Sequence, residues 1–508
     1  MRGGSFTFVY RPLFALMFRF QIHDFAIFRP KKCIKAAVFR PKKCNNLSGI
    51  GGKPMFYRKI TKQIEAWYQS QSTMKKGLVI EGLRQVGKTT TILEFLHSHY
   101  SHVNVINFKD SPSFKEIFKN ADFDHGINRF LTELSLLMPG SDFFSENSVL
   151  FLDEVQECSR ARYSIKPLCA KTGLHIIASG SLLGIRGYNR EIDGDIPTGS
   201  ETILTMRPMD FEEYLLAVGE SQKTIDYLRE SFAARSPIAT PIHERMLRLF
   251  QEYLVVGGMP EVVDIYIKTH SLSEVISKQR SLVVEYRGDF GRFVDKNGAP
   301  RIDENLRRKI DLILDSVPSQ LAKENSKFFY SEIQGKPRKN AFSDALDWLC
   351  DFGLLCKCHR LNALSLPLKA YANLDAYKVY VQDTGLFLSM LDDGTSINVL
   401  RGDIGLYKGY IYENVVADAL IKRNEALYYY SNENGLEIDF VLPFHGKPTL
   451  VEVKAKSGHT KASRTVLADK RKYPDVEECI KLTSNNIGVA YPYSTFPYYL
   501  TYLIGEEM

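Results

Sequence analysis

The sequence lacks any long apolar run and any regular spacing of its cysteines. Arg11, Arg19 and Asp24 interrupt the aromatic-rich stretch near the start, so no run there reaches the roughly 18–20 residues that a membrane span needs. That stretch also lacks the continuous apolar region and small-residue cleavage site of a signal peptide. The 8 cysteines are scattered, which is typical of reduced thiols rather than a disulfide framework. These absences predict a cytoplasmic protein without a membrane partner.

No second pair of metal ligands follows the tightest cluster of thiols. Cys350, Cys356, Cys358 and His359 could form a metal site on composition alone. However, they lie in and beside the apolar stretch 348–355, and no ligand pair follows at the spacing of a zinc site. We therefore expect these side chains to pack in the core.

Acidic residues are almost absent from residues 1–54, which contain 11 Lys and Arg and one acid, a net charge of +10. Of the 66 basic and 59 acidic residues in the chain, 55 and 58 remain for residues 55–508, a net charge of −3. The formal charge of +7 therefore originates in the first segment. Nucleic-acid binding cannot be argued from the total charge, although local basic patches stay open.

Residues 1–54 also contain a short repeat, because Phe28–Cys33 recurs as Phe39–Cys44. One interpretation is a basic targeting arm, and the other is translation from too early a start. We favour Met55 as the start, since Met55–Ile60 leads into a helical pattern. A version that begins at Met55 is expected to keep its thermal stability and its turnover. A clear drop in melting temperature would show that the segment packs on the body.

A phosphate-binding loop follows the short apolar run Leu78–Ile80, which predicts a buried parallel strand. Residues 82–89 match G-x-x-x-x-G-K-[ST] in full. In such a loop backbone N–H groups surround phosphates, and the following helix, expected over Thr90–His97, directs its positive end at the same charge. Lys88 should reach the β- and γ-phosphates of ATP, and Thr89 should hold Mg²⁺. The residues expected to bind the nucleotide here are Gly82, Arg84, Gln85, Val86, Gly87, Lys88, Thr89 and Thr90.

A second apolar run, Val149–Leu152, ends in Asp153 and Glu154. Behind a complete phosphate-binding loop, Asp153 fits the carboxylate that holds Mg²⁺ through water, and Glu154 fits the general base that polarises the attacking water. A third run, Leu174–Ala178, precedes Ser179 and Ser181, either of which could sense the γ-phosphate; the alternative is a simple turn.

Together with a further strand over Val103–Phe108, these segments alternate strand and helix. That order predicts an α/β fold with a doubly wound parallel sheet and the nucleotide at the carboxyl ends of its strands. Residues 211–293 then read as helices that form a lid, interrupted by a turn at Gly257–Pro260. A helix over Ala341–Phe352 followed by strands at Leu354–His359 and Lys378–Val381 predicts a module like a winged helix, which serves DNA contact in some proteins and packing in others.

Six motifs occur in one order: Gly82–Thr90, Leu152–Glu154, Ser179–Gly184, Arg207–Glu213, Gly257–Pro260 and Tyr380–Leu386. Residues 55–508 thereby resemble the prokaryotic family of AAA-type ATPases that carry a C-terminal domain of unknown function related to restriction endonucleases. The resemblance implies ATP binding and a nuclease-like tail. The expected domains are an atypical extension (1–54), the AAA-type ATPase (55–200), the helical lid (201–300), the winged-helix-like module (301–400) and the restriction-endonuclease-like domain (401–508).

The tail is expected to begin with a helix over Lys408–Asn424 that carries Glu413, followed by strands at Ala426–Tyr430, Glu437–Leu442 and Thr449–Lys454. Asp439 falls in the second strand, and alternation places Glu452 and Lys454 on one face of the third. This pattern matches the D…[D/E]-x-K core of restriction-type nucleases. Asp439 and Glu452 would then hold Mg²⁺, Lys454 would activate water, and Glu413 would add an outer ligand. The alternative is an ordinary strand with a surface Glu-x-Lys ion pair.

Three functions are compatible with these residues. The ATPase cycle could move or gate a tail that acts on or binds DNA or RNA; the chain could instead be a nucleotide-dependent switch for a protein partner or a second copy of itself; or residues 1–54 could tether the ATPase to a membrane. A metal-dependent nuclease assay with and without ATP separates the first two, and fractionation with and without residues 1–54 decides the third. Candidate arginine fingers are Arg186, Arg190 and Arg207.

Overall fold

The computed structural model describes residues 56–182, 199–290, 302–321, 328–336, 338–403, 408–423, 426–454 and 461–505. Residues 1–54 and two candidate arginine fingers, Arg186 and Arg190, lie outside the described residues. Within the described ranges, no helix is both long and apolar enough to cross a membrane.

A parallel sheet of five strands carries the predicted phosphate-binding loop, and its order is β2-β3-β4-β1-β5. The strands are β1 (Gly77–Gly82), β2 (His102–Asn107), β3 (Ser148–Asp153), β4 (His175–Ser181) and β5 (Glu201–Met206). The four strands expected from apolar runs are present, and β4 lies between β1 and β3. β5 was not predicted. It pairs with β1 as an edge strand with mostly half-exposed side chains, so the sheet extends past residue 200.

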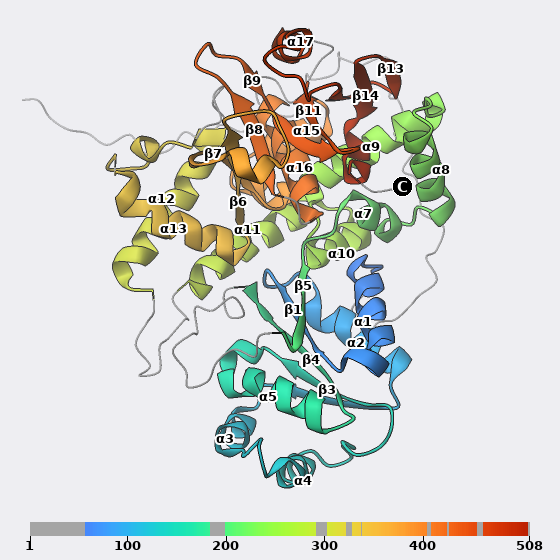
Figure 1. The fold of residues 1–508 in the computed structure, drawn as a ribbon, viewed down its shortest axis with the longest axis vertical. Helices are drawn as coiled ribbons and strands as arrows, with labels where there is room; N and C mark the ends of the chain where they lie inside the picture. The colour runs from blue at the N-terminus through green and yellow to red at the C-terminus, as the bar shows by residue number, and fades with distance from the viewer. Residues whose placement is uncertain are drawn as a thin grey trace, which may run out of the picture. The chain divides into compact units, whose positions relative to one another are not determined.

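Helices cover both faces of this sheet, as shown in Figure 1. They are α1 (Ile60–Met74), α2 (Lys88–His99), α3 (Pro112–Asn120), α4 (Ile127–Leu137) and α5 (Ser159–Lys171). Leu78 and Ile80 of β1 pack in one core with α1 and α2, whereas Val79 packs in another with α3, α4 and α5. This alternation arises because successive strand side chains point to opposite faces. The doubly wound α/β arrangement is therefore confirmed.

The chain after β5 is helical, as predicted. Its helices are α7 (Phe211–Ala217), α8 (Gln222–Ala233), α9 (Thr240–Val256), α10 (Pro260–Thr269) and α11 (Leu272–Asp289). α9 ends at Gly257, whose φ of 73° suits glycine, and Pro260 begins α10. The predicted turn at Gly257–Pro260 is therefore present, and it fixes the direction of α10.

The next module contains the predicted helix and hairpin, but the hairpin is not a free wing. Its elements are α12 (Glu304–Leu321), α13 (Lys339–Phe352), β6 (Leu355–Leu361), β7 (Ala372–Val381), α14 (Thr384–Ser389) and α15 (Thr395–Leu400). β6 pairs with β7 on one side and with β8 (Leu427–Ser431) on the other, so the sheet continues beyond residue 400. Cys356 and Cys358 are buried in the core, as expected.

The C-terminal segment contains α16 (Lys408–Lys422), β9 (Glu437–Ile438), β10 (Phe440–Phe444), β11 (Lys447–Val453), α17 (Lys461–Ala468), β12 (Cys479–Thr483), β13 (Gly488–Ala490) and β14 (Tyr493–Pro497). The predicted hairpin is present, because β10 and β11 pair antiparallel. The placement of Asp439 within one strand was wrong. β9 pairs with β8 in one sheet and β10 pairs with β11 in another, so the backbone changes sheets at Asp439.

Candidate functional site

The phosphate-binding loop connects the end of β1 to the first turn of α2. A Cβ atom on Gly82 would lie 2.3 Å from the carbonyl oxygen of Met206 on β5, so only glycine fits between these strands. Gln85 and Gly87 have φ values of 66° and 91°, which turn the loop back on itself. α2 begins at Lys88, and its free N–H groups and positive helix end favour a bound anion.

Residues that are distant in the sequence hold this loop. Arg58 donates to the carbonyl of Val86 at 2.6 Å. Arg84 pairs with Asp289 at 2.5 Å, and Gln85 donates to Glu285 at 2.5 Å; both acids lie on α11. The loop is therefore fixed before any ligand binds. Sequence reasoning missed Arg58, because no motif marks it and its partner is 28 residues away.

Asp153, at the carboxyl end of β3, is the centre of the site. It accepts hydrogen bonds from the Thr89 hydroxyl at 3.1 and 3.2 Å and from Asn107 at 3.0 Å. The Ser179 hydroxyl also donates to it, whereas the backbone N–H of Ser181 donates to Gln156. The structure thus brings together Thr89, Asp153 and Ser179, and of the two candidate serines it is the Ser179 side chain that contacts Asp153. Asn107 was missed, although a polar residue at the end of β2, next to β3, was a usable signal.

Lys88 and Glu154 lie in the same cavity. The ammonium group of Lys88 donates to the carbonyl oxygens of Gly82 and Leu83 at 3.1 Å each. Burial lowers the pKa of Lys88, although the nearby Glu154 and Asp153 carboxylates oppose that change. Glu154 adopts a left-handed conformation with a φ of 53°, and the Gln156 amide donates to its carboxylate. Both side chains therefore line the cavity beside the phosphate-binding loop.

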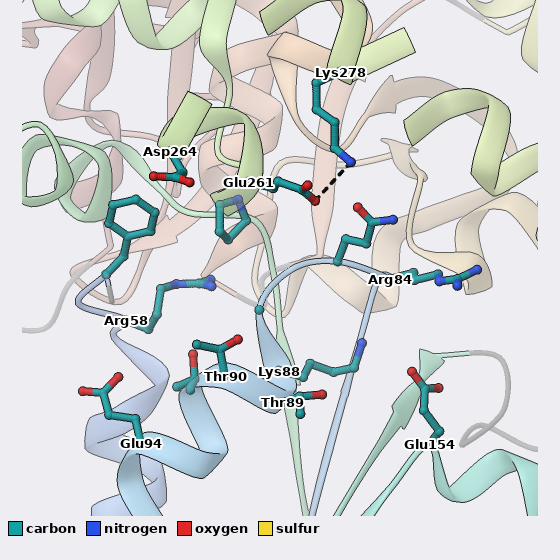
Figure 2. Close-up of a pocket in the computed structure, with 15 residues that line it drawn as sticks. Arg58, Arg84, Lys88, Thr89, Thr90, Glu94, Glu154, Glu261, Asp264 and Lys278 are labelled. Atoms are coloured by element: carbon teal, nitrogen blue, oxygen red, sulfur yellow. Dashed lines mark ion pairs between the residues drawn. The ribbon is translucent and has the colours of Figure 1, made fainter. Parts of the chain in front are cut away.

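Two helices beyond the sheet complete the cavity, which has a volume of about 570 Å³. Glu261 and Asp264 from α10 and Lys278 from α11 line it opposite Lys88 and Thr89, as Figure 2 shows. Glu261 and Lys278 form an ion pair of 3.1 Å. Arg207 is not among the lining residues; it donates to Gln382 at 2.6 Å instead.

A second cluster of charged side chains lies where β9, β10 and β11 meet. Lys454 contacts the Glu452 carboxylate at 2.6 Å and the Asp439 carboxylate at 3.4 Å. The backbone N–H of Val453 donates to Asp439 at 2.7 Å, and that of Ser463 on α17 donates to Glu452 at 3.3 Å. The predicted convergence of Asp439, Glu452 and Lys454 is thus present in the structure.

Burial, together with the Glu413 and Glu452 carboxylates, raises the pKa of Asp439 to about 7 against the opposing effects of Lys454 and Lys378. Lys378 has only 1% of its side chain exposed and contacts Glu413 and Glu437 at 2.8 Å each. Burial opposes ionisation of Glu413, but Lys378 and the hydrogen bonds from Lys378 and Tyr380 outweigh it and lower its pKa. Glu413 is therefore held as a carboxylate by a lysine that sequence reasoning missed.

The donor sets of the two sites differ in their fit to Mg²⁺. The Thr89 hydroxyl beside the Asp153 carboxylate is an oxygen pair of the kind that Mg²⁺ prefers. In the tail, Asp439 and Glu452 supply suitable oxygens on either side of Lys454, whereas Glu413 is already bound to Lys378. Across the described residues, no group of three or more Asp, Glu, His and Cys side chains has the arrangement of a metal site.

Replacing Lys378 with Met should lower the free energy of unfolding by about 3–5 kcal/mol, because two buried carboxylates would lose their counter-ion. Urea denaturation followed by circular dichroism measures this change. Lys115→Met, which removes an exposed ion pair with Glu157, is the matched control and should leave stability almost unchanged. Equal small losses in the two variants would contradict the assignment.

Comparison with known families places an AAA domain at residues 74–215. Residues 247–396 and 408–496 match two families described as domains of unknown function, DUF8612 and DUF4143, and neither description names a nuclease or a winged helix. No curated protein matches the chain. The AAA match, the strand order and the Asp153 site together show that the chain carries an AAA-type ATPase domain.

Among solved structures, the chain is similar to the Walker-type ATPase PABY2304 of Pyrococcus abyssi, with 14% identity, 66% of this chain and 96% of that chain covered, and a TM-score of 0.38. The ORC2 protein of Aeropyrum pernix, solved as ADPNP–ADP complexes, is 12% identical, with 69% of this chain and 95% of that chain covered and a TM-score of 0.34. AMPPCP-bound DnaA of Aquifex aeolicus is 15% identical, with 58% of this chain and 90% of that chain covered and a TM-score of 0.25. TM-scores this low add nothing to the assignment, which rests on the AAA match and the geometry.

Proposed function

We propose that the AAA domain binds and hydrolyses ATP and that its cycle acts on the C-terminal domain. The observation that carries the first part is the convergence of Thr89, Asn107 and Ser179 on Asp153, beside a loop already shaped for phosphates. A polar group of this kind at the carboxyl ends of parallel strands is where α/β sheets bind their ligands.

Each residue then has a separate role. Lys88 contacts the β- and γ-phosphates, and the N–H groups at the start of α2 contact the same charge. Thr89 and Asp153 would hold Mg²⁺, which neutralises charge on the phosphates when it is bound. Glu154 orients the attacking water and accepts its proton, while Ser179 reports the γ-phosphate to Asp153.

Calorimetric titration with Mg²⁺–ATP and an assay of phosphate release test this proposal on the full chain. We expect saturable binding of one ATP per chain and slow release of phosphate that stops when EDTA removes Mg²⁺. Absence of binding by a folded protein would contradict it.

For the C-terminal domain, we propose a nuclease-like site that binds nucleic acid and cleaves it with a divalent cation. Support comes from Asp439 and Glu452, whose carboxylates both contact the ammonium group of Lys454. Asp439 and Glu452 would hold Mg²⁺, which supplies Lewis acidity to the phosphodiester. Lys454 would orient the attacking water. Cleavage of single- and double-stranded DNA and RNA with Mg²⁺ or Mn²⁺, with and without ATP, tests it.

The alternative function is a nucleotide-dependent switch with an inactive nuclease-like scaffold. One observation favours it: Lys378 pairs with Glu413 and Glu437, so the negative charge of Glu413, the expected outer ligand, is already compensated by a lysine. Intact ATP binding without cleavage of any substrate would support the switch. A nucleotide-dependent shift in the chain's oligomeric state, measured by light scattering, would identify a second copy as its partner.

A further inference from the structure

Three of the sequence motifs, Arg207–Glu213, Gly257–Pro260 and Tyr380–Leu386, meet at one buried point beside the start of α10. The backbone N–H of Met209, in the segment after β5, donates to the carbonyl of Gly258 at 2.7 Å. The N–H of Gly258 donates to the Asp383 carboxylate at 2.6 Å, and the N–H of Leu386 donates to the other oxygen of that carboxylate at 2.9 Å. Asp383 is only 1% exposed, so its carboxylate depends on these protein N–H groups and not on solvent for its hydrogen bonds. Asp383 therefore joins the turn before α10 to the first turn of α14.

The backbone segments at this junction are closely packed. A Cβ atom on Gly258 would lie 2.0 Å from the carbonyl oxygen of Met209, and one on Gly385 would lie 2.7 Å from the nitrogen of Gly257. Asp383 itself has a φ of 85°, a conformation that is unfavourable for a non-glycine residue and persists only where its surroundings enforce it. The two backbones can therefore approach only in this register, and Asp383 sets it.

The C-terminal helix α16 holds Asp383 from the other side. Asp418 accepts the backbone N–H of Asp383 at 3.1 Å and pairs with Lys422 at 2.8 Å. Lys422 in turn donates to the carbonyl of Met209 at 3.0 Å. A continuous set of buried bonds thus runs from the end of β5 through the turn to α16. The same helix carries Glu413 of the carboxylate cluster.

We propose that Asp383 is a positioning residue of the nucleotide site, through which α16 sets the place of the lid helix α10. The proposal rests on ATP binding in the cavity, as proposed above. Pro260, Glu261 and Asp264 line that cavity, and the turn that Asp383 holds leads directly into them. A packed junction of this kind changes between discrete arrangements rather than deforming smoothly. A change in the C-terminal domain would therefore alter ATP affinity, and ATP would alter that domain by the same factor.

Asp383→Asn is the direct test, because the amide has the same shape but must direct its NH₂ group at one of the two N–H donors. We expect the Kd and KM for ATP to rise about 10-fold while kcat falls less than about twofold, since the catalytic groups near Asp153 do not move. Tyr330→Phe, which loses a buried hydrogen bond to Tyr377 of 2.6 Å in the same module, is the matched control and should keep the wild-type Kd.

The pH dependence of ATP binding by the wild-type protein is a second test of the role of Asp383, because it involves no variant that could lose stability. Burial and the Asp418 carboxylate raise the pKa of Asp383 to about 6 against the opposing effect of Lys422. The other titratable groups that interact with Asp383 are Tyr253 on α9 and Tyr286 on α11, and burial raises the pKa of each. Above about pH 6 the Asp383 carboxylate is charged and accepts the N–H groups of both Gly258 and Leu386. Below that pH the carboxyl group is protonated and cannot accept both. ATP affinity should therefore fall as the pH drops through about 6.

Asp418→Asn keeps the acceptor for Asp383 but removes the charge that raises its pKa, so the inflection should move to lower pH even if Asp383→Asn does not fold. A wild-type protein that binds no ATP overturns the proposed function. Wild-type binding together with an unchanged Kd in Asp383→Asn, or an inflection that Asp418→Asn does not move, overturns the positioning role alone. Affinity loss in Asp383→Asn with the Tyr330→Phe control unchanged supports it.

Discussion

Lys88→Ala should abolish measurable ATP binding without unfolding the protein. Lys88 is buried at the floor of the cavity and is the cation placed to reach the β- and γ-phosphates. Loss of two charge-assisted hydrogen bonds, each worth about 1.5–3 kcal/mol, weakens affinity by about 100-fold or more. Titration calorimetry measures the affinity, and Lys171→Ala on the surface of α5 is the control that should bind normally.

Glu154→Gln should give the opposite combination: normal ATP binding and almost no hydrolysis. The left-handed backbone at Glu154 presents its carboxylate to the cavity, and glutamine keeps the shape but cannot accept a proton. Loss of a general base lowers kcat by about 100- to 10,000-fold. Glu157→Gln, in the same turn but paired with Lys115, should leave kcat unchanged. Undiminished hydrolysis in both Lys88→Ala and Glu154→Gln would rule out this assignment of the site.

The parts of this site that could be predicted from the sequence depend on short segments of chain. An apolar run followed by a glycine-rich loop, a lysine and a threonine specifies a strand, an anion-binding turn and a helix within about a dozen residues. The carboxyl end of β3 followed from an equally short run, whereas the run before Ser179 and Ser181 did not decide between these two serines. The strand order then brought Thr89, Asp153 and Ser179 together as expected, because neighbouring parallel strands end at one edge of the sheet.

The parts that could not be predicted depend on pairs that are distant in the sequence. Asp383 and Gly258 are 125 residues apart, and Lys378 is 35 residues from Glu413, so neither bond leaves a local pattern. Lys378 lies in the buried part of a strand, where a lysine is not expected unless its carboxylate partners are known. β5 was not predicted for another reason. It is an edge strand with half-exposed side chains, so it lacks the apolar run that marks the central strands.

The tail shows both outcomes in a few residues. Alternation along the predicted strand Thr449–Lys454 placed Glu452 and Lys454 on one face, and their side chains meet at 2.6 Å, although β11 itself ends at Val453. It could not show that the preceding strand breaks at Asp439, since that break depends on which sheet each half joins. The break directs the Asp439 carboxylate toward the N–H of Val453 and toward Lys454. Tertiary pairing thus completes a cluster that the sequence pattern only outlines.

Asp439→Ala and Lys454→Ala should therefore separate cation binding from cleavage in the proposed nuclease-like site. Asp439 and Glu452 supply the oxygens that a divalent cation prefers, so Asp439→Ala should remove both Mn²⁺ binding and cleavage. Lys454 repels a cation but is placed to orient water, so Lys454→Ala should keep or strengthen Mn²⁺ binding and lower the cleavage rate by about 100-fold or more. Calorimetric titration with Mn²⁺ in the absence of nucleotide measures the first property, because the AAA site then lacks the phosphates that complete its cation site.

Asp469→Ala, which removes an exposed carboxylate after α17 in the same domain, is the control for both measurements and should behave as the wild type. Two results would contradict the assignment in different ways. Mn²⁺ binding that survives Asp439→Ala places the cation elsewhere in the chain. Cleavage that survives Lys454→Ala with its rate unchanged means that another group orients the water. Cation binding by the wild type without cleavage of DNA or RNA would leave Asp439 and Glu452 as a binding site, and since Lys378 already fixes the charge of Glu413 beside them, the switch would then be the better account of the tail.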